Sequence, residues 1–228
     1  MDESPAPSGT TRADEAFRQI RAAIVNGSIP PGSKISENTL ANQFGVGRGP
    51  LREAIRRLEG SKLVQIQPNV GAKVISLDVP QAIEIYEIRE ALEGLACRLA
   101  AERATTDDCR KLSALLDKHE TQIRSDNWLN YHQQEGDLDF HYQVIQLSGN
   151  ARLFDLLCGE LYHLMRLYRR QTGAQPSRPE QALKEHQQIV DAIAQNDGEL
   201  AELLMKRHIS SARKTLLSKL NHNVMDET

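Results

Sequence analysis

The feature that most constrains this chain is a basic amphipathic segment over residues 46–60, which reads VGRGPLREAIRRLEG. At helical spacing its apolar side chains fall on one face and its arginines form a neighbouring stripe. The apolar positions are Leu51, Ile55 and Leu58, and the stripe comprises Arg48, Arg52 and Arg56. The segment therefore predicts a helix with one apolar face and one basic face.

A shorter helix is predicted just before this segment. Ser36 is a typical N-cap, Leu40 and Phe44 follow at helical spacing, and Gly45 ends the helix in a tight turn. Two short helices joined by a glycine-containing turn, the second with arginines near its N-terminus, form a helix-turn-helix. A further helix is predicted over residues 13–25.

Two runs of alternating apolar and polar residues follow the basic helix, in the sequence KLVQIQPNVGAKVISL, with residues 68–71 between them. This pattern predicts a β-hairpin, and a hairpin after a recognition helix is a wing. One arginine-rich helix alone is weak evidence, because soluble proteins often carry charge on a solvated helix face. The ordered series of helices, glycine turn, basic helix and hairpin favours a winged helix-turn-helix that binds DNA.

Charge is distributed unevenly along the 228 residues, although the formal net charge is only -3. Residues 12–76 hold ten Lys and Arg against five Asp and Glu, so the acidic excess lies elsewhere in the chain. A basic module joined to an acidic one is typical of a nucleic-acid-binding head with a separate sensing body.

The sequence predicts a cytoplasmic protein that does not associate with membranes. It has no run of about 18 apolar residues, and the N-terminal MDESPAPSGTT lacks the apolar stretch of a signal peptide. Its three cysteines, Cys97, Cys109 and Cys158, are odd in number and widely spaced, which favours reduced thiols over a disulfide framework.

From residue 78 onward the pattern is helical, and nothing in 78–220 alternates like a strand. This part is predicted to be an antiparallel all-helical bundle, which makes the whole fold mainly α. The expected domains are 13–77 and 78–220, with a disordered tail over 1–12 and a tail over 221–228. The predicted bundle helices span about 78–102, 105–124, 128–147, 152–171, 179–195 and 199–220.

Four residues that can bind a metal lie near apolar helix faces of the second module. Asp137 and His141 are four residues apart, a spacing that places two side chains on one side of a helix. His186 and His208 lie beside apolar residues of two other predicted helices. Imidazoles with one carboxylate suit Zn²⁺, Ni²⁺ or a similar ion, and bundle interiors hold such sites.

Spacing alone leaves the metal interpretation open. A histidine near an apolar face is more often a core or boundary residue, and an Asp–His pair at this spacing is also common on helix surfaces. The remaining histidines lack comparable pairings and are predicted to lie on the surface. They are His119, His132, His163 and His222.

Arg89 is a charged residue within a largely apolar predicted helix. It has two interpretations. It pairs with Glu93, four residues later, which is the commoner arrangement, or its guanidinium holds an anionic ligand, because this group recognises carboxylates through two parallel hydrogen bonds.

Together these segments resemble the GntR-type transcription regulators of the FadR subfamily, whose ligand-binding part is the all-helical FCD domain. In the first module the resemblance rests on IPPGSKISENTLANQFGVGRGPLREAIRRLEGSKLVQIQPNVGAKV. In the second it rests on IREALEGLACRLAA, DLDFHYQVIQLSGN, EHQQIVDAIAQND and HI near the end. It covers nearly all of residues 13–220, and the two sets of motifs occur in the family's order.

The resemblance implies DNA contacts for several residues of the first module. Arg48 and Arg52 match arginines that reach guanine edges and flanking phosphates. Asn38 stands where the family often has an arginine that contacts DNA. Gly47 and Gly49 replace small hydroxyl residues that bind phosphate, so backbone N–H groups remain for that contact. The glycine of the wing tip is matched by Gly71.

The resemblance also implies a metal ion and an effector. Asp137, His141, His186 and His208 match the ligands of the metal-binding variant of the domain, for Zn²⁺ first and for Ni²⁺ or Mn²⁺ as alternatives. Arg89 matches an arginine associated with small carboxylate effectors beside the metal. The implied protein is a homodimer, commonly a repressor, that binds palindromic double-stranded operator DNA. An organic-acid effector would modulate that binding.

Two other classes of function fit parts of the sequence. A metal held by one aspartate and three histidines, with a bound water, is a hydrolase arrangement. However, no general base pairs with the site and the DNA-binding head would be unexplained, so we do not expect an enzyme. The second alternative is a helical body that recruits a partner protein around an inert metal.

Overall fold

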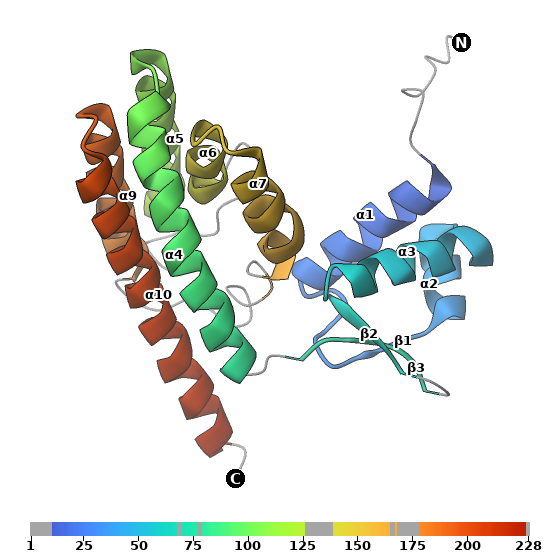
Figure 1. The fold of residues 1–228 in the computed structure, drawn as a ribbon. Coiled ribbons are helices and arrows are strands. Elements are labelled where there is room, and N and C mark those ends of the chain that lie inside the picture. Colours follow the sequence, from blue (N-terminus) through green and yellow to red (C-terminus); the bar gives the residue numbers. More distant parts are fainter. Residues whose placement is uncertain are drawn as a thin grey trace. The chain divides into compact units, whose positions relative to one another are not determined.

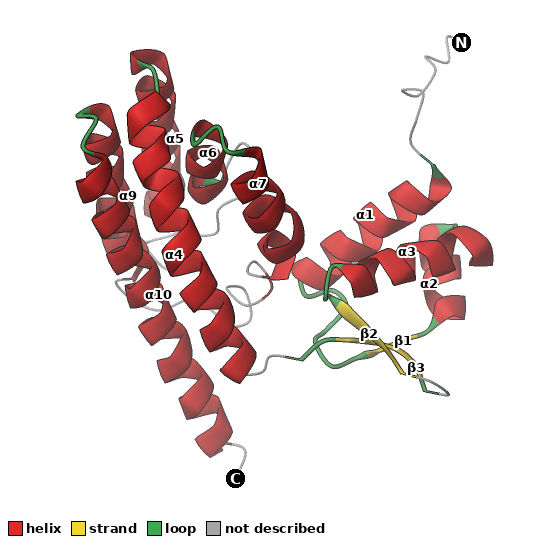
Figure 2. Ribbon diagram, viewed as in Figure 1, coloured by secondary structure: helices red, strands yellow, loops and turns green. Residues whose placement is uncertain are grey.

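The computed structural model describes residues 11–67, 70–76, 79–125, 139–164, 167 and 178–226. The chain divides into two compact units, one comprising residues 1–77 with 163–171 and the other 78–162 with 172–228. Figure 1 shows the elements of each unit in chain order. Within the described part of the chain, strands occur only in the first unit, and helix dominates both (Figure 2).

Three helices form the body of the first unit, namely α1 (Arg12–Val25), α2 (Glu37–Phe44) and α3 (Arg48–Gly60). Both α1 and α2 pack against α3. Complete burial of one large aliphatic side chain stabilises a fold by about 1.5–3 kcal/mol. The fully buried side chains here include Ile20, Ile24, Leu51 and Leu58.

Local signals begin and end α2 where the sequence predicts. The hydroxyl of Ser36 accepts a hydrogen bond from the backbone N–H of Thr39 at 3.3 Å. Gly45 ends the helix in the left-handed region, with φ 62°, where glycine has no side chain to clash. The turn leads directly into α3, so the predicted helix-turn-helix is confirmed.

A three-stranded antiparallel sheet completes the first unit, in the order β1-β3-β2. Its strands are β1 (Lys34–Ile35), β2 (Val64–Gln67) and β3 (Gly71–Val74). The hairpin of β2 and β3 is the predicted wing, with Gln67 opposite Gly71. The sequence does not predict β1, because two residues are too few to show alternation.

The second unit is a helical bundle, as predicted. In it α4 packs along α10, while α9 packs against α10, α5 and α4, and α6 packs on α4 and α5 (Figure 1). Of the helices that the structure describes, none is long and apolar enough to cross a membrane. The elements are α4 (Val79–Arg103), α5 (Thr106–Ser125), α6 (Phe140–Leu147), α7 (Ala151–Phe154), the π-helix η2 (Asp155–Glu160), α9 (Arg178–Ala194) and α10 (Gly198–Asp226).

The prediction of a continuous helix over 128–147 is wrong. Asp139 is extended, with φ -104° and ψ 120°, and α6 begins only at Phe140. The Asp139 carboxylate caps α6 by accepting hydrogen bonds from the backbone N–H groups of His141 at 2.9 Å and Tyr142 at 3.3 Å. Aspartate is favoured at this position because it satisfies N–H groups that have no partner within the helix.

Candidate functional site

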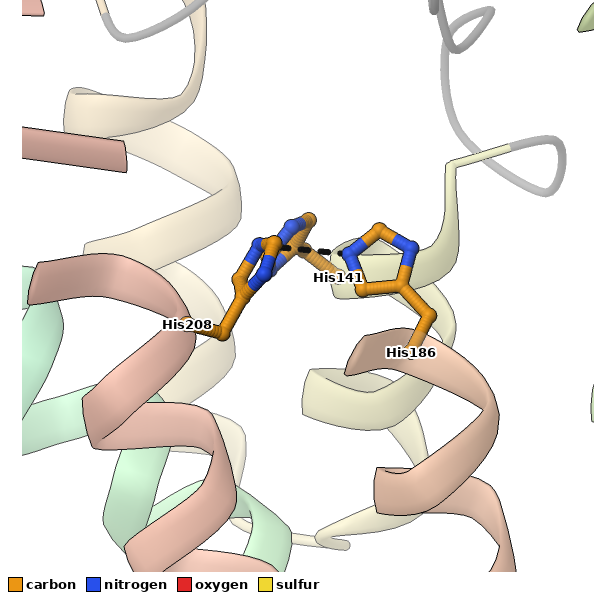
Figure 3. A group of neighbouring side chains, drawn as sticks. All are labelled: His141, His186 and His208. Carbon is orange, nitrogen blue, oxygen red and sulfur yellow. Dashed lines mark hydrogen bonds between the residues drawn. The ribbon is translucent and has the colours of Figure 1, made fainter. Parts of the chain in front are cut away.

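Three histidines from three helices converge in the interior of the second unit. His141 lies in the first turn of α6, His186 on α9 and His208 on α10, and all three are buried. One ring nitrogen of each lies within 4.8 Å of the others. Figure 3 shows the three rings turned toward one another.

The spacing of these nitrogens suits a metal ion. The Nε2 atoms of His186 and His208 are 3.2 Å apart. Two nitrogens that bind one tetrahedral Zn²⁺ ion, each at about 2.0–2.1 Å, lie about 3.3 Å from each other. The ring of Phe140 stacks on His186 with centroids 4.1 Å apart and is itself fully buried, so this side of the group is apolar.

Two carboxylates contact the Nδ1 atoms of two of these rings, on the side of each ring opposite its Nε2 atom. The Nδ1 atom of His141 is 2.6 Å from Glu93 Oε2, and the Nδ1 atom of His208 is 2.6 Å from Glu185 Oε2. Histidines that bind metals usually donate their second ring N–H to such an acceptor. This arrangement leaves Nε2 of both rings for an ion.

Sequence reasoning missed both carboxylates as parts of the site. The sequence does contain a signal for Glu93, which is an acidic residue in an apolar helix, but it predicts Glu93 only as a partner for Arg89. Glu185 and His208 lie 23 residues apart on different helices, and no sequence spacing indicates their contact.

Of the two interpretations of Arg89, the structure shows the pair with Glu93. The Arg89 side chain is buried, and its Nε donates to Glu93 Oε1 at 2.6 Å. Its guanidinium carbon lies 4.9 Å from the centroid of the Tyr86 ring. Burial alone would raise the pKa of Glu93, but Arg89 and His141 outweigh that effect and lower the pKa. Glu93 is therefore ionised, and the effector-binding role of Arg89 stays a prediction.

The surroundings keep two of the histidines neutral. Burial is the main reason why the pKa of His186 falls well below its ordinary value, and the neighbouring His208 adds to the effect. Burial also lowers the pKa of His208 to about 4, although its hydrogen bond with Glu185 acts in the opposite direction. Neutral imidazole is the form that binds metal ions, so both residues are ready to do so at neutral pH.

For the remaining residues singled out in the second part of the sequence, the structure tests some predicted positions and not others. Asp137 lies outside the described residues, as do His132 and the side chain of His222. The prediction of a surface position is wrong for His119 and His163, which are both buried. For His119 a signal existed in the sequence, because it shares a helical face with the buried residues Leu112, Leu115, Leu116 and Ile123.

The residues predicted to contact DNA lie on α2, α3 and the wing, and all are exposed. Gly47 is the N-cap of α3 and makes no side-chain cap hydrogen bond. Arg52 is tied to α2, because its Nε donates to Glu37 Oε2 at 2.9 Å, a partner that the sequence analysis did not identify. The exposed positions are Asn38, Gly47, Arg48, Gly49, Arg52 and Gly71.

Comparison with known proteins identifies both units. Residues 12–74 match the family of bacterial regulatory proteins called gntR, and residues 84–211 match the FCD domain. The chain is 31% identical over 215 residues to the uncharacterized HTH-type transcriptional regulator YdhC of Bacillus subtilis, which covers 92% of this chain and 93% of that protein. It is 28% identical over 202 residues to the HTH-type transcriptional repressor RspR of Escherichia coli, which covers 89% of this chain and 87% of that protein.

Solved structures show the same fold. McbR/YncC of E. coli has a TM-score of 0.75 at 20% identity, covering 93% of this chain and 100% of that one. A putative GntR transcriptional regulator from Rhodococcus has a TM-score of 0.71 at 23% identity, covering 91% and 98%. The chain therefore belongs to the GntR family of bacterial regulatory proteins and carries an FCD domain, which makes it a DNA-binding transcription regulator and not an enzyme.

Proposed function

We propose that this protein is a homodimeric, metal-dependent repressor that binds a palindromic operator and responds to a small organic acid. The observation that carries the proposal is the convergence of three buried imidazoles, His141, His186 and His208, within the region that matches the FCD domain. The similarity to the repressor RspR supports repression. The regulator would act in the cytoplasm, where the operator DNA is.

The metal would be held by the three histidines, with Asp137 as the proposed fourth ligand. Zn²⁺ suits these donors best, and Ni²⁺ or Mn²⁺ are alternatives. When bound, the ion would supply an electrophilic centre for a carboxylate oxygen of the effector. We propose that the guanidinium of Arg89 contacts the same carboxylate through nitrogens other than Nε, which donates to Glu93.

DNA binding is assigned to residues 13–77, and metal and effector binding to residues 78–220. Arg48 and Arg52 would read guanine edges in the major groove and contact flanking phosphates. Backbone groups around Gly47 and Gly49, together with Asn38 and the wing glycine Gly71, would contact the DNA backbone. An organic acid would change operator affinity through a coupling free energy between the two parts.

Purified protein is expected to contain about one divalent metal ion per chain, because three or four ligands converge on one point. Elemental analysis of the wild type and of a His186→Ala variant measures this. The variant should lose the metal and its thermal unfolding should become insensitive to a chelator. An Asp137→Ala variant that keeps its full metal affinity would remove Asp137 from the ligand set. Equal metal content in the wild type and in His186→Ala would contradict the site.

Replacing Arg48 by alanine is expected to weaken operator binding by about 1–3 kcal/mol for each half-site, because a two-point contact with guanine is lost. Fluorescence anisotropy with an operator duplex obtained by selection from random DNA measures the loss. The matched control is Arg110→Ala on α5, whose side chain is exposed and lies in the other unit. If the affinity for an unrelated duplex falls as much as that for the operator, Arg48 contacts only phosphates.

A further inference from the structure

The three converging histidines come from α6, α9 and α10, while α4 touches this group through the carboxylate of Glu93. We infer that Glu93, held by the buried guanidinium of Arg89, is a positioning residue of the metal centre. It keeps the ring proton of His141 on Nδ1 and thereby presents Nε2 to the ion. This inference rests on the proposed metal function and adds residues that are not themselves ligands.

The geometry fixes the Glu93 carboxylate from both sides. Oε1 accepts a hydrogen bond from Arg89 Nε at 2.6 Å, and Oε2 lies 2.6 Å from His141 Nδ1. The exposed fractions of Arg89, Glu93 and His141 are 1%, 1% and 3%, so water does not compete for these contacts. The carboxylate cannot rotate without breaking one of two buried, charge-assisted hydrogen bonds.

The pair of contacts selects one form of the imidazole. An ionised carboxylate can only accept a hydrogen bond, so the ring nitrogen that faces it must carry the proton. With the proton on Nδ1, the lone pair is on Nε2. The ring of His141 lies with its centroid 5.1 Å from that of His186 and 5.2 Å from that of His208, so these three rings are close enough for their nitrogens to share one ion.

A similar Arg–Glu–His group occurs a second time, on α9 and α10. Here one oxygen serves both partners: Glu185 Oε2 on α9 accepts a hydrogen bond from Arg178 Nη1 at 2.8 Å and lies 2.6 Å from Nδ1 of His208 on α10. Two histidines of one group are thus each held by a carboxylate that has its own arginine. This repetition supports a positioning role, because a single buried ion pair would be explained by folding alone.

The two arrangements differ in their access to water. Glu185 and His208 line a groove of about 350 Å³ between α9 and α10, and the Glu185 side chain is 19% exposed. Water in this groove can replace a lost hydrogen bond to His208, whereas the buried position of Glu93 offers no such substitute. Loss of the Glu93 carboxylate should therefore affect the metal more than loss of the Glu185 carboxylate.

The test is a Glu93→Gln variant. In the wild type Arg89 and His141 contact different carboxylate oxygens, so the single oxygen of glutamine can occupy only one of these two positions, and its NH₂ group, which can only donate, occupies the other. With the oxygen on Arg89, the NH₂ group faces Nδ1 of His141, so the ring proton moves to Nε2 and blocks the atom that should bind the metal. We expect the affinity for Zn²⁺ to fall about 10- to 100-fold, measured by competition with a chromophoric chelator.

Three further variants make the comparison specific. Glu93→Asp keeps a carboxylate and should recover part of the affinity. Glu90→Gln makes the same chemical change on α4, where Glu90 lies 3.9 Å from Arg213, and should leave the Zn²⁺ affinity unchanged. Glu185→Gln should reduce the affinity by a smaller factor than Glu93→Gln. An unchanged affinity in Glu93→Gln would overturn the inference.

The ring proton of His141 provides a readout that does not require metal. In metal-free protein with ¹⁵N-labelled histidine, imidazole nitrogen shifts should place the proton on Nδ1 in the wild type and on Nε2 in Glu93→Gln. If the wild type binds no Zn²⁺ but shows this change, the proposed function fails while the positioning of His141 stands. The same tautomer in both proteins would refute the positioning role. If Glu93→Gln does not fold, Arg89→Gln/Glu93→Gln removes both charges of the pair and serves for both measurements.

Discussion

Replacing Arg89 by methionine is expected to lower the free energy of unfolding by about 3–5 kcal/mol, because it leaves a buried carboxylate without its cation. Glu93 is 1% exposed and its Oε1 accepts a hydrogen bond from Arg89 at 2.6 Å. In the variant Glu93 must stay charged without its cation or take up a proton, and either state costs free energy. Urea unfolding of metal-free protein, followed by circular dichroism, measures the change.

A matched variant and a double variant test whether the loss of stability comes from the buried charge left on Glu93. Arg213→Met removes a partly exposed arginine of α10 that lies 3.3 Å from Glu87, and should cost less than about 1 kcal/mol. Arg89→Met/Glu93→Leu replaces the whole buried pair by apolar groups and should recover most of the lost stability. If Arg89→Met unfolds like the wild type and only its response to organic acids changes, Arg89 serves mainly as an effector contact.

Acid is expected to destabilise the metal-free protein well before its carboxylates titrate. The pKa of His208 is about 4 in the folded state, against an ordinary value of 6.5. Between these values the unfolded chain binds a proton that the folded chain excludes, so stability falls as the pH is lowered through this window. The contribution of His208 alone is on the order of 3 kcal/mol. The pKa of His186 is also lowered, chiefly by burial, so its effect has the same sign.

Urea unfolding at pH 7, 6 and 5 measures this slope, and a His208→Gln variant should flatten it. A second loss is expected below pH 4.5, because the pKa of Glu93 is lowered in the folded state and its protonation breaks the contacts with Arg89 and His141. A stability that stays constant from pH 7 to pH 5 would show that these histidines are solvated or already charged in the folded protein.

The winged helix-turn-helix could be predicted because its signals are local. Ser36 caps α2, Gly45 turns the chain, and the wing follows from alternation around a glycine, so each element depends on residues a few positions apart. The position of each of the three histidines beside the apolar face of its own helix also follows from the sequence period. Their meeting at one point does not follow from spacing alone, and only the resemblance to the FCD domain predicts it.

The parts that sequence reasoning missed depend on tertiary packing or on a choice between two local states. Contact between Glu185 and His208 requires α9 and α10 to lie in one register, which no single-helix pattern specifies. Asp139 is compatible with a helix interior or with a cap, and the unsatisfied N–H groups at the start of α6 favour the cap. The helix predicted over 128–147 is therefore not continuous.

The burial of the three histidines affects the rate at which a bound metal ion would exchange with solvent. His141, His186 and His208 are at most 5% exposed, and of the three His208 lines the groove between α9 and α10, so a bound ion would leave their nitrogens mainly when the bundle opens locally. Such openings take microseconds to seconds and are rare in a packed core. An ion held in this way would exchange slowly and would act as a resident part of the receptor, while the proposed organic acid would carry the changing signal. The supply of metal would then matter mainly when the chain folds.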